Sequence, residues 1–454
     1  MEEVGTSQPQ RKKPRYKTAK QHMEVNWHAI VKIDTDIPAI DAELKEKATL
    51  VARVGSMLLF VGTSAWRVRS SMNKVSRTLG ISSNVDIGLT TLTYTCIEND
   101  HHYTQTVVLP TTGVNTNKLM LLEYFVEEFQ EKASEYSTKQ FHEILDKIEA
   151  EKGNYEPWML GLASGFACGA FTFLLGGGLM EIIFAFLGAG IGNYVRKHLL
   201  EKKITLLMNV IIGVATACTA YVGSVKLCEW IFNLSPTHHA GYICSMLFII
   251  PGFPLITGGI DLAKLDLRSG IERITYAMLI ISVATLTGWV TALIFNFNPD
   301  DFPELDISTP VLIILRVVAS FIGIFGFSMM FNSNLFMAFC ASVIGMFSNV
   351  LRLELTDELD IPSGITSFLG ALTSGLLASI IGKKIGLPRI SITVPSIVIM
   401  VPGMFMYKAA YFIGLNDTST GILWLGKTIL VVVALPLGLI IARILTDSYF
   451  RHRS

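Results

Sequence analysis

The feature that most constrains this chain is a series of long apolar segments that begins at Pro157 and continues almost to the last residue. Each segment is roughly 18 to 25 residues long, which is the length that a helix needs to cross a hydrocarbon core of about 30 Å. We expect ten such spans, at 158–175, 179–196, 204–225, 240–258, 271–296, 310–330, 334–352, 363–382, 390–413 and 421–446. The pattern predicts an all-α polytopic membrane protein with ten transmembrane helices.

The composition supports this class and excludes several others. Charged residues make up 16% of the 454 residues, whereas soluble proteins average about 25%. The net charge is zero, so no nucleic-acid partner is expected. The six cysteines form no CxxC pair and the histidine pairs are adjacent, so we expect neither a metal site nor a cofactor.

The first 157 residues carry an ordinary mixture of charges and are predicted to be a separate unit. We expect a basic, disordered tail over residues 1–40 and an α+β domain over 41–157, in the order α-β-β-α-α. Ser64 is expected to cap a helix over 65–79, and Gly80 to end it. Strands are expected at 85–97 and 103–109, and further helices at 41–60, 117–134 and 138–151.

Basic residues are distributed unevenly over the predicted loops. With the N-terminus inside, thirteen Lys and Arg residues lie in the inner connections and the C-terminal segment, whereas the outer connections hold only Lys226 and Arg352. Because loops rich in Lys and Arg stay on the cytoplasmic side, both termini and the 41–157 domain are predicted to be cytoplasmic. The expected location is a plasma membrane, of the bacterial inner-membrane type.

Two spans are interrupted at matching places. Pro251-Gly252 breaks the fourth span and Pro402-Gly403 breaks the ninth, 151 positions later, and a slide of 156 positions pairs the second span with the seventh. Five spans separate equivalent helices, so the second unit (310–446) is predicted to be inverted relative to the first (158–297). Paired interruptions in inverted repeats point to the binding site of a secondary transporter.

The breaks are the leading candidate for a substrate site near the bilayer midplane. Unwound backbone and the positive end of a half-helix dipole would bind a carboxylate there. The alternative is a packing kink of the kind common in membrane helices. The candidate substrate-binding residues are Pro251, Gly252, Phe253, Pro254, Thr257, Pro402, Gly403, Phe405 and Lys408; for Lys408 the alternative is snorkelling to the interface.

Three charged residues in or beside the spans are candidates for proton coupling or gating. Asp261 ends the fourth span at its cytoplasmic end; the alternative is a solvated loop acid facing Arg268 or Arg273. Glu181 begins the second span at its outer end, and the alternative is an interfacial acid. Arg316 lies within the sixth span, where an arginine is costly and usually functional, unless it snorkels to the outer surface.

Small and amide residues recur inside the spans. Asn193 and Asn349 occupy equivalent places and are expected to hydrogen-bond across the interface between the repeats. Glycines spaced four apart predict close helix packing and suggest, more weakly, a homo-oligomer interface; they are Gly161, Gly165, Gly169, Gly188 and Gly192.

Several motifs resemble the threonine/serine exporter family, in order and along nearly the whole chain. They include GTSAWRV at 62–68, YEPW at 155–158, FLLGG at 173–177 and PGFPLI at 251–256, then TVP at 393–395 and VPG at 401–403. In some bacteria the two units resemble separate partner proteins, whereas here they are fused. The resemblance implies proton-driven export of small hydrophilic metabolites such as threonine and serine.

Other functions stay open at this stage. Two-subunit relatives are linked to dicarboxylates such as succinate, so a dicarboxylate exporter is the first alternative, and a passive channel is another. A hydrolase would need a nucleophile or metal motif, and the sequence has neither GxSxG nor HExxH. No enzymatic activity is expected, and the expected partners are a small-molecule substrate, protons and the lipid bilayer.

Overall fold

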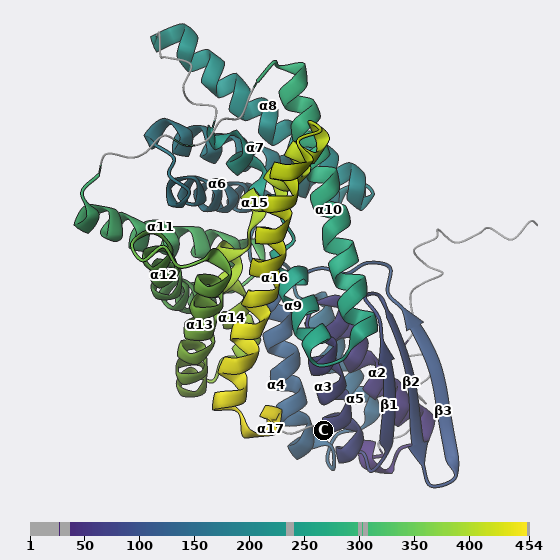
Figure 1. Cartoon of the computed structure of the whole chain (residues 1–454). Coiled ribbons are helices and arrows are strands. Elements are labelled where there is room, and N and C mark those ends of the chain that lie inside the picture. Colours follow the sequence, from purple (N-terminus) through teal and green to yellow (C-terminus); the bar gives the residue numbers. More distant parts are fainter. Residues whose placement is uncertain (1–26, 28–36, 233–239, 298–301, 303–306, 452–454) are drawn as a thin grey trace, which may run out of the picture.

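The computed structural model describes residue 27, residues 37–232, 240–297, 302 and 307–451. The predicted tail over residues 1–40 therefore lies almost wholly outside the described residues. The described chain forms an α+β domain at one end of the molecule and a larger helical part, which are arranged as Figure 1 shows.

The N-terminal domain has a helix near each of the four predicted ranges, so the order α-β-β-α-α counts one helix too few, and it has one strand more than predicted. Its elements follow the order α-α-β-β-β-α-α after a short turn of 3₁₀ helix, η2 (Ala39–Asp41). They are α2 (Leu44–Phe60), α3 (Ala65–Thr78), β1 (Ser82–Ile87), β2 (Thr91–Glu98), β3 (His101–Val108), α4 (Thr116–Lys132) and α5 (Thr138–Ala150).

The extra strand arises because the β-branched run over 85–97 is interrupted. The N–H of Gly88 donates to the carbonyl oxygen of Thr91 over 2.9 Å, and this turn separates β1 from β2. The three strands form an antiparallel sheet in the order β1-β2-β3. Alternate residues of β2, Leu92, Tyr94 and Cys96, are fully buried, and α2 packs against this strand.

Gly80 ends α3 as predicted. It adopts a φ of 71°, and the N–H groups of Gly80 and Ile81 donate to the carbonyl oxygens of Arg77 and Ser76. This is the Schellman arrangement, in which the left-handed residue is most easily a glycine. Ser64 occupies the predicted cap position of α3, but its side chain makes no capping hydrogen bond.

The helical part corresponds closely to the predicted spans. Among the described residues, eight helices are long and apolar enough to cross a membrane, or up to ten spans are present if each of two bent pairs counts as one. The first five elements are α6 (Pro157–Leu174), α7 (Leu179–Glu201), α8 (Leu206–Phe232), the bent pair η3 (Ala240–Ile249) and α9 (Gly252–Ala263), and α10 (Leu267–Ile294). Large apolar side chains remain exposed on these helices, as lipid contact requires.

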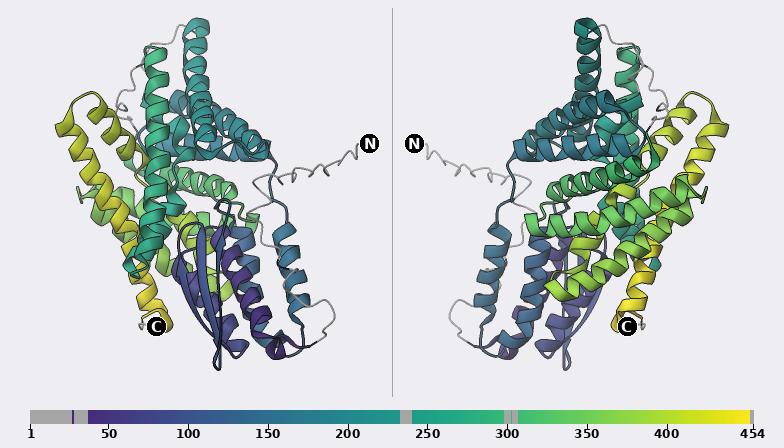
Figure 2. Two further views of the ribbon diagram at one scale, coloured as in Figure 1. Left: turned by 90° about the vertical axis from the view of Figure 1, so that its right-hand side faces the viewer. Right: turned by 90° about the vertical axis from the view of Figure 1, so that its left-hand side faces the viewer.

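The second group of elements repeats this order. It comprises α11 (Thr309–Met330), α12 (Leu335–Asp357), α13 (Ser363–Ile385), a second bent element and α16 (Thr418–Thr446). The bent element consists of α14 (Arg389–Ile397), η4 (Val398–Met400) and α15 (Gly403–Gly414). A last short helix, α17 (Ser448–Arg451), follows, and both views of Figure 2 place the C-terminal end of the described chain at the same end of the molecule as the sheet.

The glycine spacing serves packing within the chain. A Cβ on Gly165 would lie 2.8 Å from the carbonyl oxygen of Phe186 in α7, and a Cβ on Gly192 would lie 2.8 Å from that of Gly213 in α8. These faces are therefore covered by neighbouring helices, so they do not support the predicted subunit interface. Close packing also joins the two groups of helices, because a Cβ on Gly326 of α11 would lie 2.4 Å from the carbonyl oxygen of Ala163 in α6.

The two equivalent asparagines do not bond across the groups as predicted. The side-chain amide of Asn193 donates to the carbonyl oxygen of Leu160 in α6 over 2.8 Å, and that of Asn349 donates to the Ser320 hydroxyl in α11 over 2.9 Å. Each asparagine thus ties the second helix of its group to the first helix of the same group. The two hydrogen bonds are equivalent, but each lies within one group of helices and neither joins the two groups.

Candidate functional site

The two helix breaks have nearly the same backbone geometry. Pro251 has φ −81° and ψ 63°, and Pro402 has φ −80° and ψ 53°. The N–H of Gly252 donates to the carbonyl oxygen of Ile250 over 2.8 Å, and that of Gly403 donates to the carbonyl oxygen of Val401 over 2.8 Å. Both breaks are therefore inverse γ-turns centred on a proline, and they bend the two elements by 64° and 45°.

A tight 3₁₀ segment precedes each break. η3 covers ten residues, all of them buried, and η4 covers the three residues Val398–Met400. A 3₁₀ run of more than three or four residues is uncommon and often marks a hinge. Both elements thus pass from a 3₁₀ segment through a γ-turn into an α-helix whose positive end lies at the break.

The two breaks contact one another reciprocally. A Cβ on Gly252 would lie 2.8 Å from Val398 Cγ2 and 3.1 Å from Val401 Cγ2, whereas a Cβ on Gly403 would lie 3.0 Å from Leu247 Cδ2 and 3.2 Å from Ile250 Cγ1. Leu247 and Ile250 precede Val398 and Val401 by the same 151 positions that separate the two glycines. Each break is therefore in contact with the equivalent positions of the other.

A small cavity of about 20 Å³ lies between the breaks. Its eight lining residues form four equivalent pairs, namely Phe171 and Phe327, Leu247 and Val398, Ile250 and Val401, and Gly252 and Gly403. The cavity has room for about one water molecule, and its side chains are all apolar. The breaks therefore meet in a closed arrangement in which only backbone groups offer polarity.

Of the nine predicted substrate-binding residues, only Gly252 and Gly403 line this cavity. Phe253 packs edge-on against Phe331, with ring centroids 5.5 Å apart. Thr257 donates its hydroxyl to the carbonyl oxygen of Phe253 over 3.0 Å, within its own helix. Pro251 and Pro402 form the turns themselves, and Pro254 lies in the first turn of α9.

The two predicted residues of α15 face another helix. The ring of Phe405 lies 5.2 Å from that of Trp424 in α16, and the ammonium group of Lys408 lies 4.7 Å from the centre of the same Trp424 ring. Lys408 is half-buried. Phe405 and Lys408 therefore contribute to the α15–α16 contact.

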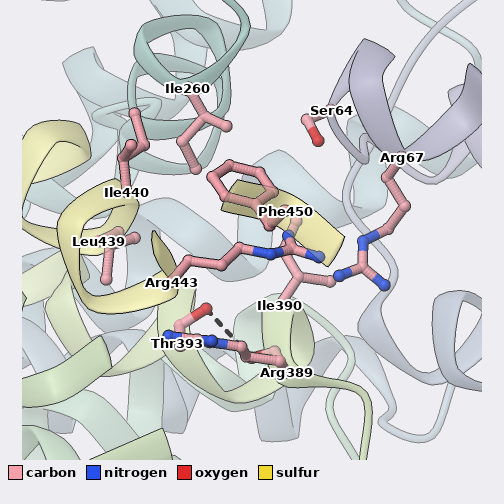
Figure 3. A pocket seen from close by; sticks show the side chains of 10 residues that line it. All are labelled: Ser64, Arg67, Ile260, Arg389, Ile390, Thr393, Leu439, Ile440, Arg443 and Phe450. Atoms are coloured by element: carbon pink, nitrogen blue, oxygen red, sulfur yellow. Dashed lines mark hydrogen bonds between the residues drawn. The ribbon is translucent and has the colours of Figure 1, made fainter. Parts of the chain in front are cut away.

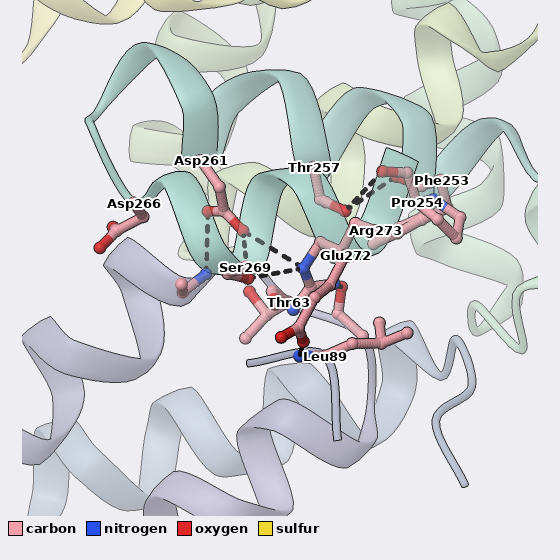
Figure 4. Close-up of polar contacts among 12 residues, drawn as sticks. Thr63, Leu89, Phe253, Pro254, Thr257, Asp261, Asp266, Ser269, Glu272 and Arg273 are labelled. Carbon is pink, nitrogen blue, oxygen red and sulfur yellow. Dashed lines mark hydrogen bonds and ion pairs between the residues drawn. The ribbon is translucent and has the colours of Figure 1, made fainter. Parts of the chain in front are cut away.

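Asp261 is fully buried, so the interpretation as a solvated loop acid is wrong. Figure 4 shows its carboxylate between α9, α10 and the N-terminal domain. One oxygen accepts the Ala65 N–H at 2.9 Å, and the other accepts the Ser269 hydroxyl at 2.9 Å and lies 3.2 Å from Arg273 Nε. Asp261 thus caps α3 in place of Ser64, and it pairs with the buried Arg273.

Arg273 ties this cluster to the loop before α3. Its Nη2 donates to the carbonyl oxygen of Thr63 over 2.7 Å, and its Nη1 donates to that of Gly62 over 3.3 Å. The neighbouring Glu272 accepts the N–H of Leu89 at 2.5 Å, and Arg69 pairs with Asp266 at 2.6 Å. The domain is therefore docked on the α9–α10 connection by a buried ion pair surrounded by more exposed ones.

Glu181 and Arg316 lie away from the cavity lining. Glu181 is buried in the first turn of α7, and it packs against the start of η3, because a Cβ on Gly241 would lie 3.0 Å from Glu181 Cβ. Arg316 pairs with Glu354 at 2.7 Å and also with Asp357, both on α12. Glu181 and Asp261 therefore flank the first bent element at its two ends, whereas Arg316 joins α11 to α12.

Comparison with known proteins identifies the family. Residues 49–296, more than half of the chain, match the family described as a putative threonine/serine exporter. The chain belongs to the threonine/serine exporter family. Residues 316–445 match a second exporter family, described as threonine/serine exporter, so the two matches together run over both groups of helices. The resemblance in the sequence motifs is confirmed.

Relatives of this exporter include proteins named for another substrate. The chain is 25% identical to the probable succinate transporter subunit YjjP of Klebsiella aerogenes over 253 residues, which are 56% of this chain and 95% of that protein. The Escherichia coli K12 protein of the same name is 25% identical over 247 residues, 54% of this chain and 92% of its own length.

A fungal relative matches more locally. Pheromone-regulated membrane protein 10 of Debaryomyces hansenii is 24% identical over 165 residues, which are 32% of this chain and 15% of that protein. No solved structure matches the chain.

Sequence reasoning missed a set of buried hydroxyl groups in the second group of helices of this exporter. Ser374 on α13 and Ser396 on α14 hydrogen-bond to each other, and both are fully buried. Within the described part of the chain, the hydroxyls of Ser328, Ser367 and Ser391 are buried without a partner. The run of hydroxyl residues over 391–396, close before the second break, could have indicated two of these groups, Ser391 and Ser396.

Proposed function

We propose that this exporter is a secondary transporter that moves small hydrophilic amino acids of the threonine and serine type out of the cytoplasm. The substrate binds between the two helix breaks, and the proton gradient drives its export. The observation that carries this proposal is the reciprocal contact of Gly252 and Gly403 with the opposite break, in a chain of an exporter family. The two groups of helices are the inverted repeats of this mechanism.

The breaks provide the chemistry that a carboxylate needs. α9 begins at Gly252 and α15 begins at Gly403, so two helix N-termini converge on the cavity. Each carries roughly half a positive charge, which stabilises an anion. A cavity of about 20 Å³ is too small for an amino acid, so binding requires the two breaks to separate. The described arrangement is then the closed state of an alternating-access cycle.

Two acids are placed to control the ends of the first bent element. Asp261 and Arg273 form the inner gate, because their ion pair joins α9 to α10 and to the domain. Glu181 contacts the outer half at Gly241 and is the corresponding candidate for taking up a proton from outside. Protonation of Asp261 would weaken its attraction for Arg273 and release the inner end. In this proposal both termini lie in the cytoplasm and the membrane is a bacterial inner membrane.

A dicarboxylate exporter is the second candidate. The observation that favours it is the name of the two bacterial relatives, each called a probable succinate transporter subunit. Converging helix N-termini would accept either ligand, since both carry a carboxylate. The choice therefore rests on which compound the purified protein transports.

The test is transport by the full chain reconstituted in proteoliposomes loaded with labelled threonine, serine or succinate. Efflux should depend on the protein and rise under an imposed proton gradient. Gly252→Val and Gly403→Val should each abolish it, because a branched side chain cannot fit against Val398 or Leu247. Gly223→Ala and Gly426→Ala are the controls, since nothing lies within 4 Å of a Cβ at either position.

Efflux that ignores the gradient for all three compounds would contradict proton coupling and favour a passive channel. Full activity of both valine variants would place the substrate elsewhere. Transport of succinate alone would support the second candidate.

A further inference from the structure

A recess of about 30 Å³ lies where the N-terminal domain meets the helices, and it is lined by arginines (Figure 3). Arg67 and Ser64 come from the N-terminal region of α3, Arg389 and Thr393 from α14, and Arg443 from α16. Ile260 of α9 also lines it. The recess therefore lies between the halves of the two bent elements that face the domain.

Arg443 is held in place while its terminal nitrogens stay available. Its guanidinium carbon lies 4.3 Å from the centre of the Trp66 ring and 4.4 Å from that of the Phe450 ring. Its Nε pairs with Asp447 at 3.3 Å. Among the described residues, nothing accepts a hydrogen bond from its Nη1 or Nη2. The two rings lie edge to face, with centroids 5.1 Å apart, so Arg443 packs against both of them from one side. This packing fixes the orientation of a planar group that is suited to bind a planar anion.

Arg67 faces Arg443 across the recess, as Figure 3 shows. Its Nη1 pairs with Glu123, and its Nε is a buried donor that has no acceptor in the described part of the chain. Ser64 is 3% exposed, and its hydroxyl points toward the same space. That hydroxyl does not cap α3, because Asp261 accepts the Ala65 N–H instead.

The positive charge of the recess is not fully balanced by its neighbours. Glu123 pairs with Arg67 and Asp447 with Arg443. Arg389 donates to two neutral groups, the Thr446 hydroxyl at 2.7 Å and the Gly375 carbonyl oxygen at 2.9 Å. Three guanidinium groups thus line a small recess beside two carboxylates, which favours an added anion.

A larger groove leads to this recess. It has a volume of about 400 Å³ and shares Arg67 and Arg443 with the recess. Small-molecule sites span roughly 300–1,000 Å³, so a whole metabolite fits the groove while the recess holds only its anionic end. Lys74 and Arg77 add positive charge along the groove, which is also lined by the acids Glu123, Glu127 and Asp447.

We propose that this recess binds the carboxylate of the substrate at the cytoplasmic entrance, between the guanidinium groups of Arg67 and Arg443. This inference rests on the proposed function and assigns a task to the N-terminal domain, which supplies Arg67 and Ser64. The carboxylate binds here first and is then released toward the breaks when α9 and α14 move apart. The recess selects compounds that carry a carboxylate.

The experiment measures binding of succinate, serine and serinol, which lacks the carboxylate, to the full chain in phosphatidylcholine nanodiscs. The charge-balanced variants R67Q/E123Q and R443Q/D447N should weaken binding of succinate and serine at least ten-fold. R268Q/D86N is the matched control, because that ion pair lies at the same domain contact but outside the recess. Serinol should bind weakly to the wild type and to all of these variants.

Unchanged affinity for both carboxylates in the two recess variants would overturn the proposal. Phosphatidylglycerol nanodiscs test a lipid source: loss of succinate binding there would assign the recess to a headgroup phosphate and overturn it as well. Wild-type protein offers a measurement that does not depend on variants. Succinate should protect Arg67 and Arg443 from modification by phenylglyoxal, whereas serinol should not. Absence of protection by succinate would contradict the proposal.

The same assay separates this proposal from the transport site. Gly252→Val should block transport but leave succinate binding at the recess within two-fold of wild type. If Gly252→Val transports normally while R443Q/D447N binds succinate poorly, the proposed recess site is supported and the proposed site at the breaks is contradicted.

Discussion

Asp261 and Arg273 form a buried ion pair, with the carboxylate 3.2 Å from Arg273 Nε and both side chains at most 2% exposed. The pair joins three parts of the molecule, because Asp261 also accepts the Ala65 N–H of α3. Ala65 and Asp261 are 196 positions apart in the sequence. A charge at the end of a broken helix thus holds the domain against the helical part.

Asp261→Asn should lower the free energy of unfolding by about 3 kcal/mol, because it leaves the Arg273 charge buried without a counter-charge. The double variant Asp261→Asn/Arg273→Met should recover part of this loss. Thermal unfolding of the purified proteins measures the difference. Equal unfolding temperatures for wild type and Asp261→Asn would show that the pair does not anchor the domain.

Gly326→Ala should destabilise the protein by about 1–3 kcal/mol, the usual cost of overpacking. Its new Cβ would lie 2.4 Å from the Ala163 carbonyl oxygen, a backbone atom that cannot move aside easily. Gly223→Ala is the control. With nothing within 4 Å, it should stabilise α8 by up to about 1 kcal/mol. Identical melting behaviour of the two variants would refute the close α6–α11 packing.

Arg316→Gln should cost at most about 1 kcal/mol, because its pairs with Glu354 and Asp357 lie at a partly exposed surface. Transport in proteoliposomes should keep the wild-type KM and rate. A rate reduced ten-fold or more, with unfolding unchanged, would instead assign Arg316 a gating role.

Burial raises the pKa of the Cys96 thiol from its ordinary value of 9.0 to about 12. The folded state therefore holds a proton that the unfolded state releases, so this contribution to stability is complete below pH 9 and is lost as the pH rises from 9 to 12. At pH 8.5 Cys96 should resist iodoacetamide until the domain unfolds, whereas the partly exposed Cys228 should react. Mass spectrometry reads both sites, and rapid alkylation of Cys96 in folded protein would contradict its burial.

Much of the architecture could be predicted from the sequence because it depends on local pattern. Apolar length gave the position of each span, and the left-handed Gly80 ends α3 where expected. The extra strand was missed because β-branched residues continue through the turn at Gly88. A propensity pattern alone does not show where such a run folds back.

The candidate site was predicted only in part, since its contacts join residues far apart in the sequence. The proline–glycine pairs located both breaks. Their sequence neighbours Phe405 and Thr257 are not among the residues that line the cavity; Phe405 packs on Trp424 and Thr257 bonds within α9. Arg67 and Arg443 face each other only because the N-terminal domain packs against the helical part. In the sequence, Arg67 appears only within the motif at 62–68, and Arg443 only as one of the basic residues that predict the orientation in the membrane.

The most direct test of the central claim is a disulfide between the two breaks. A Cβ at residue 252 would lie 3.8 Å from Val401 Cβ, which is close to the mean separation in disulfides. Gly252→Cys/Val401→Cys, in a chain whose six native cysteines are replaced, should cross-link on oxidation. Transport should then stop and return on reduction. A cross-linked protein that still transports, or thiols that never join, would contradict the claim that substrate passes between these breaks.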